Sequence, residues 1–131
     1  RFATPGVNIG LFCSTPMVAL SRNVAPKHAM EMLLTGDMIP AARAVEIGLV
    51  NRLAPPDRLA AAAAALAAQI AARSSKVVRF GKQGFYRQLP MNLSDAYALA
   101  AEAMIENMTF ADAAEGIDAF VEKRPPRWSD S

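Results

Sequence analysis

Proline and glycine divide this chain into short segments, most of which have the residue spacing of a helix. Pro16 and Pro40 each precede a run with helical spacing, and Gly36 and Gly48 each follow one. Proline is accepted in the first turn of a helix, whereas glycine readily takes the left-handed conformation that ends one. Pro90 closes a later segment, because proline cannot continue a helix. The positions of these prolines and glycines therefore predict a mostly helical chain with few strand residues.

The first 54 residues are predicted to contain short helices and parts of two strands. Residues 2–4 are expected to end one strand, and residues 49–53 show the alternation typical of another. Residues 1–14 are rich in Gly, Pro, Ser and Thr, which indicates an extended segment and a loop. Helical spacing predicts helices at 16–24, 27–35 and 41–47.

The later residues are predicted to form longer helices. Asp57 and Asn92 are each expected to cap the start of a helix, and Thr109 with Asp112 has the form of a capping box. The helix after Asp57 is rich in alanine, which lets a neighbouring backbone come close. Helices are expected at 57–73, 76–89, 92–108 and 109–123, and the third carries an apolar stripe of Leu93, Tyr97, Ala100, Met104 and Met108.

Composition argues against several classes of protein. Hydrophobic residues make up 53% of the chain and charged residues 20%, which is typical of a packed globular domain. The apolar run at 59–68 is shorter than the roughly 20 residues of a membrane helix, so we expect a soluble protein. One Cys and one His exclude a disulfide framework and a metal site made from these ligands, and they indicate a reducing compartment. The 14 basic residues are spread out among 12 acidic ones, which argues against nucleic-acid binding.

The beginning of the chain suggests a longer protein. Arg1 is not a methionine, and the first residues form neither a signal peptide nor a transit peptide. Helices that follow the end of a strand need a sheet to pack against, and this sequence offers almost none. We therefore expect the sheet in an N-terminal part of the same protein or in another chain.

Several short motifs follow one another along nearly the whole chain. They are Phe2-Ala-Thr-Pro5, Ala29-Met-Glu-Met-Leu-Leu-Thr-Gly-Asp37, Ile39, Ala44, Gly48-Leu-Val50, Glu115-Gly116 and Phe120-Val-Glu-Lys-Arg124. As a set they resemble the crotonase superfamily of enoyl-CoA hydratases and isomerases. The resemblance implies an α/β crotonase (ClpP/crotonase-like) fold, of which this chain is the mostly helical C-terminal part with one or two short strands. Residues 1–54 would end the spiral core, and residues 55–131 would form the helical trimerisation region.

By this resemblance the protein binds coenzyme A thioesters and stabilises a thioester enolate through two backbone amides of the N-terminal half. Hydratases of the family use two glutamates as acid and base, and Gly6 occupies the position of the second. No catalytic residue is therefore assigned within this chain, and the next acidic residue, Glu31, lies on a predicted helix. The residues expected to contact the substrate are Pro5, Gly6, Phe12 and Cys13.

The resemblance assigns Lys123 and Met104 to coenzyme A, which enters as part of the substrate, and it implies neither a permanently bound cofactor nor a metal. Lys123 suits phosphate as a compact charge, and Met104 stands where hydratases carry an aromatic residue. The expected partners are an acyl-CoA substrate, the N-terminal half of the same protein, and further copies in a homotrimer or a hexamer of two trimers. The expected location is the cytoplasm, or the mitochondrial matrix in a eukaryote.

Purely structural roles remain open for several of these residues. Lys123 and the two arginines that follow it could stabilise a helix end. Cys13 could line a pocket or the core, because only His28 is available to activate it and His28 suits a surface or capping position. Trp128 could cover a neighbouring subunit.

The function also has alternatives. The first is an active enoyl-CoA hydratase or isomerase. The second is a catalytically silent family member that works as a coenzyme-binding or interaction module, and Gly6 favours it. The third is an acyl-CoA thioesterase that uses an activated water.

Overall fold

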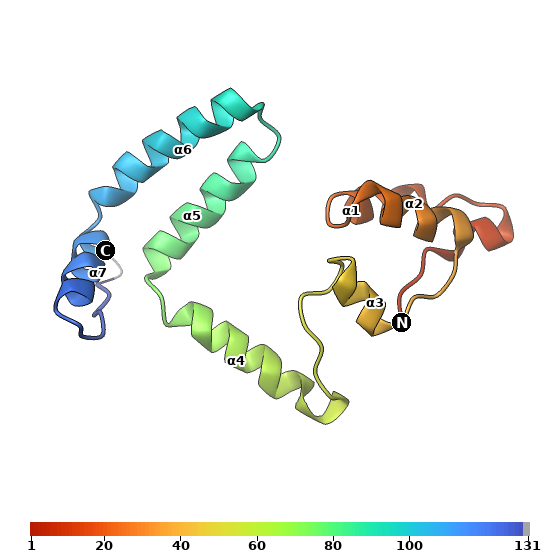
Figure 1. Ribbon diagram of the computed structural model, residues 1–131, viewed down its shortest axis with the longest axis horizontal. Helices are drawn as coiled ribbons and strands as arrows, with labels where there is room; N and C mark the ends of the chain where they lie inside the picture. Colours follow the sequence, from red (N-terminus) through yellow and green to blue (C-terminus); the bar gives the residue numbers. More distant parts are fainter. Residues whose placement is uncertain (130–131) are drawn as a thin grey trace. The chain divides into compact units, whose positions relative to one another are not determined.

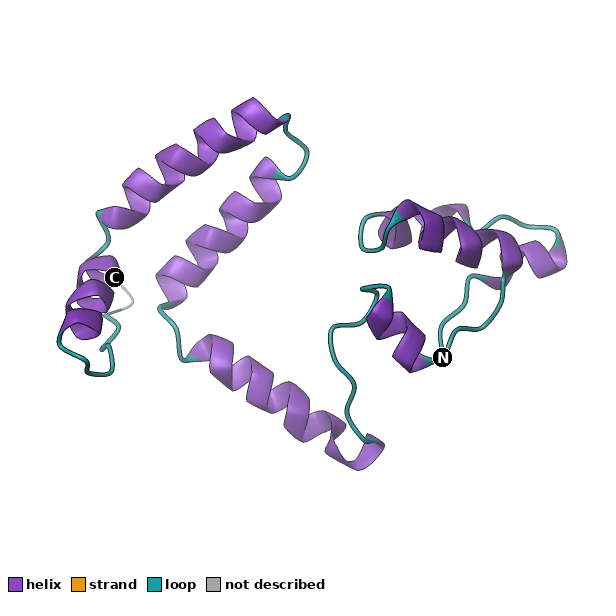
Figure 2. Cartoon of the chain, in the orientation of Figure 1, coloured by secondary structure: helices purple, strands orange, loops and turns teal. Residues whose placement is uncertain are grey.

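The computed structural model describes residues 1–129 of the chain (Figure 1). These residues form α-helices and two 3-10 helices joined by loops (Figure 2). Their only strand pairing is one isolated bridge. The chain divides into a first unit, up to Ala62, and a second unit, from Ala63. The predicted mostly helical character is confirmed, whereas the roles assigned to 1–54 and 55–131 stay predictions.

The first unit consists of short helices, most of which begin or end next to a proline or glycine. α2 ends at Gly36, which has the left-handed φ of 67° that glycine adopts without strain. α3 follows Pro40, and the chain turns at Gly48 with a φ of 80°. The helices of this unit are η1 (Pro5–Ile9), α1 (Ser14–Ser21), α2 (Pro26–Thr35), α3 (Ala41–Glu46) and η2 (Pro56–Arg58).

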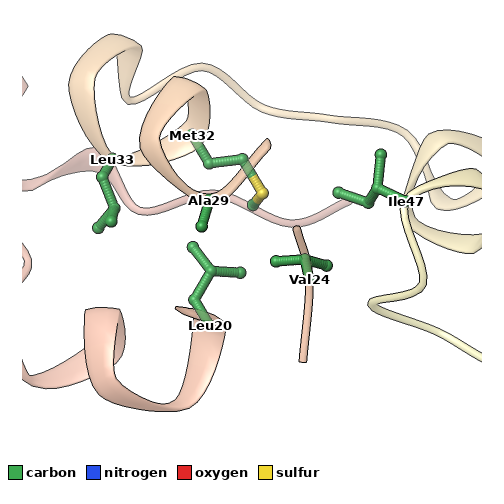
Figure 3. Packing of buried hydrophobic residues seen from close by; sticks show 6 residues of the cluster. All are labelled: Leu20, Val24, Ala29, Met32, Leu33 and Ile47. Carbon is green, nitrogen blue, oxygen red and sulfur yellow. The ribbon is translucent and has the colours of Figure 1, made fainter. Parts of the chain in front are cut away.

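The core of the first unit lies where α1 and α2 pack together (Figure 3). Leu33 is 2% exposed, and burying a side chain of this size contributes roughly 1.5–3 kcal/mol. The Thr4 hydroxyl, also buried, donates a 2.8 Å hydrogen bond to the Met32 carbonyl and so ties the first residues to α2. The buried apolar cluster comprises Leu20, Val24, Ala29, Met32, Leu33 and Ile47.

The two predicted strand fragments have different outcomes. Phe2 pairs with Ile39 in an antiparallel bridge, with N–H to O distances of 3.0 and 2.9 Å, so the expected strand end is present as a single pair. The strand predicted at 49–53 is wrong. The Val50 N–H donates to the Ala44 carbonyl of α3, which makes this segment the exit turn of a helix. Alternation alone could not reveal that the partner strand is missing from the described residues.

The predicted helix starts also have mixed outcomes. Asn92 caps α6 as predicted, because its side chain accepts a 3.0 Å hydrogen bond from the Asp95 N–H. Asp57 does not cap a helix but lies within the 3-10 turn η2. The predicted capping box is wrong, since the Thr109 hydroxyl donates back to the Glu106 carbonyl and Phe110 holds the N-cap position of α7 without a side-chain bond.

The second unit contains the longer helices, among which α5 and α6 pack along each other (Figure 1). The Ser74 hydroxyl caps α5 by accepting from the Val77 N–H at 3.2 Å. The Phe110 ring meets Phe80 edge-on at 5.1 Å and carries the Lys76 ammonium 4.6 Å above its centre. The helices are α4 (Leu59–Ala71), which spans the boundary between the units, α5 (Ser75–Gln88), α6 (Leu93–Met108) and α7 (Ala111–Val121).

α4 and α6 leave apolar faces uncovered by the described residues. Every residue of α4 is exposed, including Leu66 and Ile70. The large side chains of the predicted stripe on α6 are also exposed, from 57% at Met108 to 75% at Leu93. The predicted helical spacing is therefore correct. The surface that such stripes normally bury against is not supplied by residues 1–129.

Candidate functional site

The loop that begins at Gly6 closes on itself. The Leu11 N–H donates to the Gly6 carbonyl at 2.9 Å, and the Gly6 N–H donates to Cys13 Sγ at 3.2 Å. A Cβ placed on Gly6 would lie 2.7 Å from the Leu11 carbonyl oxygen and 2.8 Å from Cys13 Sγ. Real Cβ atoms do not approach neighbours so closely. This position therefore excludes any side chain unless the loop backbone moves.

α2 supports this loop from outside. A Cβ on Gly36, the C-cap of α2, would lie 3.0 Å from Asn8 Oδ1 and 3.0 Å from a methyl carbon of Val7. The helix end and η1 are thus in close contact, which needs a residue without a side chain as well as a positive φ. The Leu-Thr-Gly motif therefore holds the Gly6 loop in place.

The four residues assigned to the substrate lie on one short stretch but in different surroundings. Gly6 and Cys13 are half-buried and in direct contact. Pro5 is exposed at the start of η1, and Phe12 is 43% exposed. The structure brings Gly6 and Cys13 together, and a substrate-binding role for all four stays a prediction.

The only histidine does not accompany the only cysteine. His28 Nδ1 accepts a hydrogen bond from the Arg43 guanidinium at 3.3 Å and lies 4.0 Å from the Glu31 carboxylate. Cys13, in turn, is bonded to the Gly6 N–H. These contacts favour the structural interpretation of both residues over a nucleophile and its base.

Lys123 stands in an unusual backbone position. It is the only non-glycine residue with a positive φ, 57°, in the described part of the chain. The Lys123 N–H donates to Phe120 O at 3.3 Å, and the Arg124 N–H donates to Ala119 O at 3.0 Å. Together these bonds form a Schellman motif, in which glycine normally occupies the position that Lys123 holds. A left-handed lysine costs about 1 kcal/mol relative to glycine.

An ionic clasp fixes the turn around Lys123. The Arg124 guanidinium binds both carboxylate oxygens of Glu115, at 2.6 and 3.0 Å, and the Arg127 N–H donates to Glu115 Oε1 at 2.7 Å. The hydrogen bond from Arg124, followed by that from Arg127, lowers the pKa of Glu115 to about 2. The same pairing raises the pKa of Arg124 further. We refer to Glu115, Arg124 and the Arg127 backbone as the clasp.

Met104 lines a cavity of about 280 Å³ between α5 and α6. Phe80, Phe85 and Leu99 provide further apolar surface, and a Cβ on Gly84 would meet nothing within 4 Å. The cavity offers apolar surface next to Met104, as the assignment to coenzyme A requires. Whether Met104 contacts coenzyme A stays a prediction.

Trp128 packs within its own chain. Its indole N–H donates to the Ala72 carbonyl at 3.0 Å, and its ring carbons lie near the position that a Cβ on Gly116 would take, at 3.4 and 3.5 Å. Ser129 adds two hydrogen bonds from its N–H and hydroxyl to the buried Asp112 carboxylate. These contacts give Trp128 a role in fixing this chain's own tail, and the hypothesis that it covers a neighbouring subunit stays a prediction. Residues 130–131 lie outside the described residues.

The sequence interpretation missed a cationic groove beside α5. Residues 58–94 contain six basic residues and not one Asp or Glu. Four of the six line a concavity of about 710 Å³ together with apolar side chains. In the linear sequence these cations are three to six residues apart and look dispersed, but a helix gathers residues three and four apart onto one side. The acid-free stretch was the signal that could have revealed the groove.

Two features are absent from residues 1–129. No helix there combines the length and the apolar character needed to cross a membrane. No group of His, Cys, Asp and Glu side chains in the same residues is arranged to hold a metal ion.

Comparison with known proteins decides the relationship. The sequence pattern of the enoyl-CoA hydratase/isomerase family matches residues 1–131. This chain belongs to that family. The predicted crotonase relationship is therefore confirmed.

Individual family members are similar over nearly the whole chain. Enoyl-CoA hydratase domain-containing protein 3, mitochondrial, of Rattus norvegicus is 53% identical over 128 residues, which are 98% of this chain and 43% of that protein. The crystal structure of an enoyl-CoA hydratase from Mycobacterium smegmatis matches with a TM-score of 0.91 and 48% identity, over 97% of this chain and 49% of the other. The crystal structure of the human domain-containing protein 3 matches with a TM-score of 0.89 and 50% identity, over 97% and 50%. The chain spans about half the length of the family members it matches.

Proposed function

We propose that this chain is part of a subunit that binds acyl-CoA thioesters and stabilises a thioester enolate, and that residue 6 takes no part in proton transfer. The observation that carries the second half is the closed loop, in which the Leu11 carbonyl and Cys13 Sγ occupy the space of a side chain at position 6. The first half is supported by membership of the enoyl-CoA hydratase/isomerase family.

The closed loop limits the chemistry that the subunit can perform. Addition of water to a conjugated double bond needs one group to deprotonate water and another to protonate carbon. Gly6 supplies neither, and a glutamate there would have to displace the backbone at Leu11. Any acid or base must therefore come from other residues, and the proposal places them, with the amides that hold the enolate, in the N-terminal half.

The strained position of Lys123 supports a coenzyme A contact. The helix end itself does not require a lysine at this position, since glycine is the usual residue there in a Schellman motif. A lysine at a backbone position that favours glycine is disfavoured unless its side chain has a use. Its exposed ammonium suits a coenzyme A phosphate as a point charge.

The uncovered faces of α4 and α6 support an assembly with further protein. Apolar residues such as Leu66, Leu93 and Met108 are exposed in this chain. We place the N-terminal half of the same protein and further copies of the subunit against them, in a homotrimer or a hexamer of two trimers. The mass of the full-length protein in solution, measured by light scattering, tests this assembly, and a monomer contradicts it.

The relatives and the cysteine usage support a proposed location. The similar rat protein is named as mitochondrial. A single cysteine, half-buried and unpaired with another cysteine, suits a reducing compartment. We therefore place the protein in the mitochondrial matrix if its source is eukaryotic, and otherwise in the cytoplasm.

A catalytically silent member of the family is the second candidate, and the closed Gly6 loop favours it as well. Both candidates bind acyl-CoA, but only the first forms an enolate. Exchange of the protons α to the thioester carbonyl for deuterium reports enolate formation without requiring hydration. This exchange therefore separates the two candidates.

The test uses full-length protein, a saturated medium-chain acyl-CoA in D₂O, and NMR. Calorimetry measures binding, and α-deuteration measures the enolate. Binding with exchange supports the proposal, whereas binding without exchange supports the silent alternative, and absence of binding contradicts both. The same sample treated with a thiol reagent reveals a thioesterase through release of free coenzyme A.

Variants at position 6 test the second half of the proposal with an enoyl-CoA substrate. We expect Gly6→Glu to create no hydration, because its Cβ would meet the Leu11 carbonyl oxygen even when Cys13→Ala removes the sulfur. Gly84→Ala is the matched control, since a Cβ there meets nothing within 4 Å. Hydration that rises with Gly6→Glu would show that the loop opens and that position 6 can carry a proton.

A further inference from the structure

The groove beside α5 has a cationic rim and an apolar floor. Its four basic residues are Arg73, Arg79, Lys82 and Arg87, all with exposed side chains. No Asp or Glu lines it, and within the described residues none of the four forms an ion pair. The positive charge of the groove is therefore not neutralised by an ion pair within residues 1–129.

Local sequence explains why the cations share one side. Lys82 follows Arg79 by three residues and Val78 by four, and Tyr86 follows Lys82 by four, so all lie along one face of α5. Arg73 reaches the same groove from the turn between α4 and α5, and Ile70 reaches it from the end of α4. The concavity thus combines the end of one helix with the side of the next.

The shape and chemistry of the groove limit its ligand. A volume of about 710 Å³ lies in the range of roughly 300–1,000 Å³ typical of small-molecule sites. Guanidinium groups bind phosphate through two parallel hydrogen bonds, and lysine adds a point charge. Tyr86, which is 62% exposed, and Val78 offer a flat aromatic and an aliphatic surface beside these cations. A ligand that matches both parts has phosphate at one end and a planar or apolar group at the other.

We propose that the groove beside α5 binds a soluble phosphate ester with a planar base, such as a nucleoside diphosphate. The phosphates lie against Arg79 and Lys82, and the base lies against Tyr86. A concave groove suits a soluble ligand better than the flat surface of a membrane. The site is separate in sequence from Lys123, which the proposed function assigns to the coenzyme A of the acyl substrate.

The probes are ADP, inorganic pyrophosphate and adenosine, measured by calorimetry on the full-length protein. We expect ADP to bind more tightly than pyrophosphate because of the base, and adenosine to bind weakly because it lacks phosphate. Affinity for ADP should fall as salt rises, since exposed charges are screened. Equal binding of adenosine and ADP overturns the proposal, because the cations would then contribute nothing.

Variants locate the site. Losing one charge-assisted hydrogen bond weakens binding by about tenfold, so Arg79→Gln with Lys82→Gln should weaken ADP by about a hundredfold or more. Tyr86→Leu should weaken ADP and leave pyrophosphate nearly unchanged. Arg58→Gln is the matched control, because Arg58 belongs to the same acid-free stretch but does not line the groove. Thermal unfolding of each variant verifies that the fold persists.

Two further measurements distinguish this site from other places where the protein could bind phosphate. ADP is also part of coenzyme A, so Lys123→Gln serves to identify binding at the acyl-CoA site. Loss of ADP binding with Lys123→Gln alone, and not with the groove variants, overturns the proposal and leaves the proposed function standing. Groove-dependent binding to vesicles of anionic phospholipid, without binding of ADP, overturns it in favour of a lipid surface.

Discussion

The Gly6 loop and the helices of the second unit differ in whether their polar and apolar groups find partners within this chain. In the loop, the Gly6 N–H and carbonyl both have partners, and its glycine leaves no room for a side chain. In the second unit, α4 and α6 expose apolar side chains, and Lys123 is strained. The backbone at Gly6 is thus satisfied within this chain, whereas the apolar faces of α4 and α6 can be buried only by a ligand or further protein.

The largest expected effect contrasts a core leucine with an uncovered one. Leu33→Ala should destabilise the protein by about 2–5 kcal/mol, because it leaves a cavity in the core of the first unit. Leu66→Ala on α4 should cost less than about 1 kcal/mol in this chain alone, but more in the full-length protein if its face is covered there. Urea unfolding of both variants, in this chain and in the full-length protein, measures these losses of stability. A Leu66 variant that is neutral in both proteins would show that no other part of the protein covers this face of α4.

The next effect probes the closed loop. Gly6→Ala should cost about 1–3 kcal/mol, because its methyl group must displace the Leu11 carbonyl or Cys13. Gly81→Ala, within α5 and without neighbours, should instead stabilise the protein by about 1 kcal/mol through higher helix propensity. Thermal unfolding compares the two, and equal stability of both variants would mean that the loop opens readily.

A smaller effect separates strain from binding at Lys123. Lys123→Gly should raise stability by about 1 kcal/mol, because glycine accepts the left-handed φ of 57°. The same change should weaken acyl-CoA binding, since the ammonium is lost. Lys123→Gln is the matched variant: it removes the charge and keeps the strain. Unchanged acyl-CoA affinity in both variants would reduce Lys123 to a structural helix end.

The sequence predicted helices better than it predicted their ends or pairings. Gly36 and Asn92 act on their own neighbours, so their effects can be read locally. The strand at 49–53 failed because a strand is defined by a partner elsewhere in the fold, and here the Val50 N–H turns back to α3. Thr109 could bond forward or backward, and nothing in its own sequence decides between them.

The candidate site was predictable only in part for the same reason. The absence of a carboxylate at Gly6 was visible in the sequence through resemblance. The approach of the Leu11 carbonyl oxygen to position 6 could not be predicted, because it depends on how residues 6–11 turn back on themselves. The groove could not be predicted because its cations come together only when α5 forms a helix. The clasp joins Glu115, in the middle of α7, to Arg124 beyond the end of that helix.

The smallest expected effect concerns the pH dependence of the clasp. The folded-state pKa of Glu115, about 2, lies below its ordinary value of 4.5, so its stabilising contribution is fully present above about pH 4.5 and is lost as pH falls toward 2. Glu115→Gln removes that contribution at every pH. The difference in unfolding temperature between parent and variant should therefore shrink between pH 6 and pH 2.5.

The difference between the two proteins isolates Glu115, because every other carboxylate titrates in both. Because the clasp is only half-buried, salt should also reduce the difference at pH 6. A difference that stays constant with pH would mean that Glu115 acts through packing and not through charge. In that case the Schellman hydrogen bonds alone would hold Lys123 in its left-handed conformation, and the clasp would have no part in positioning it.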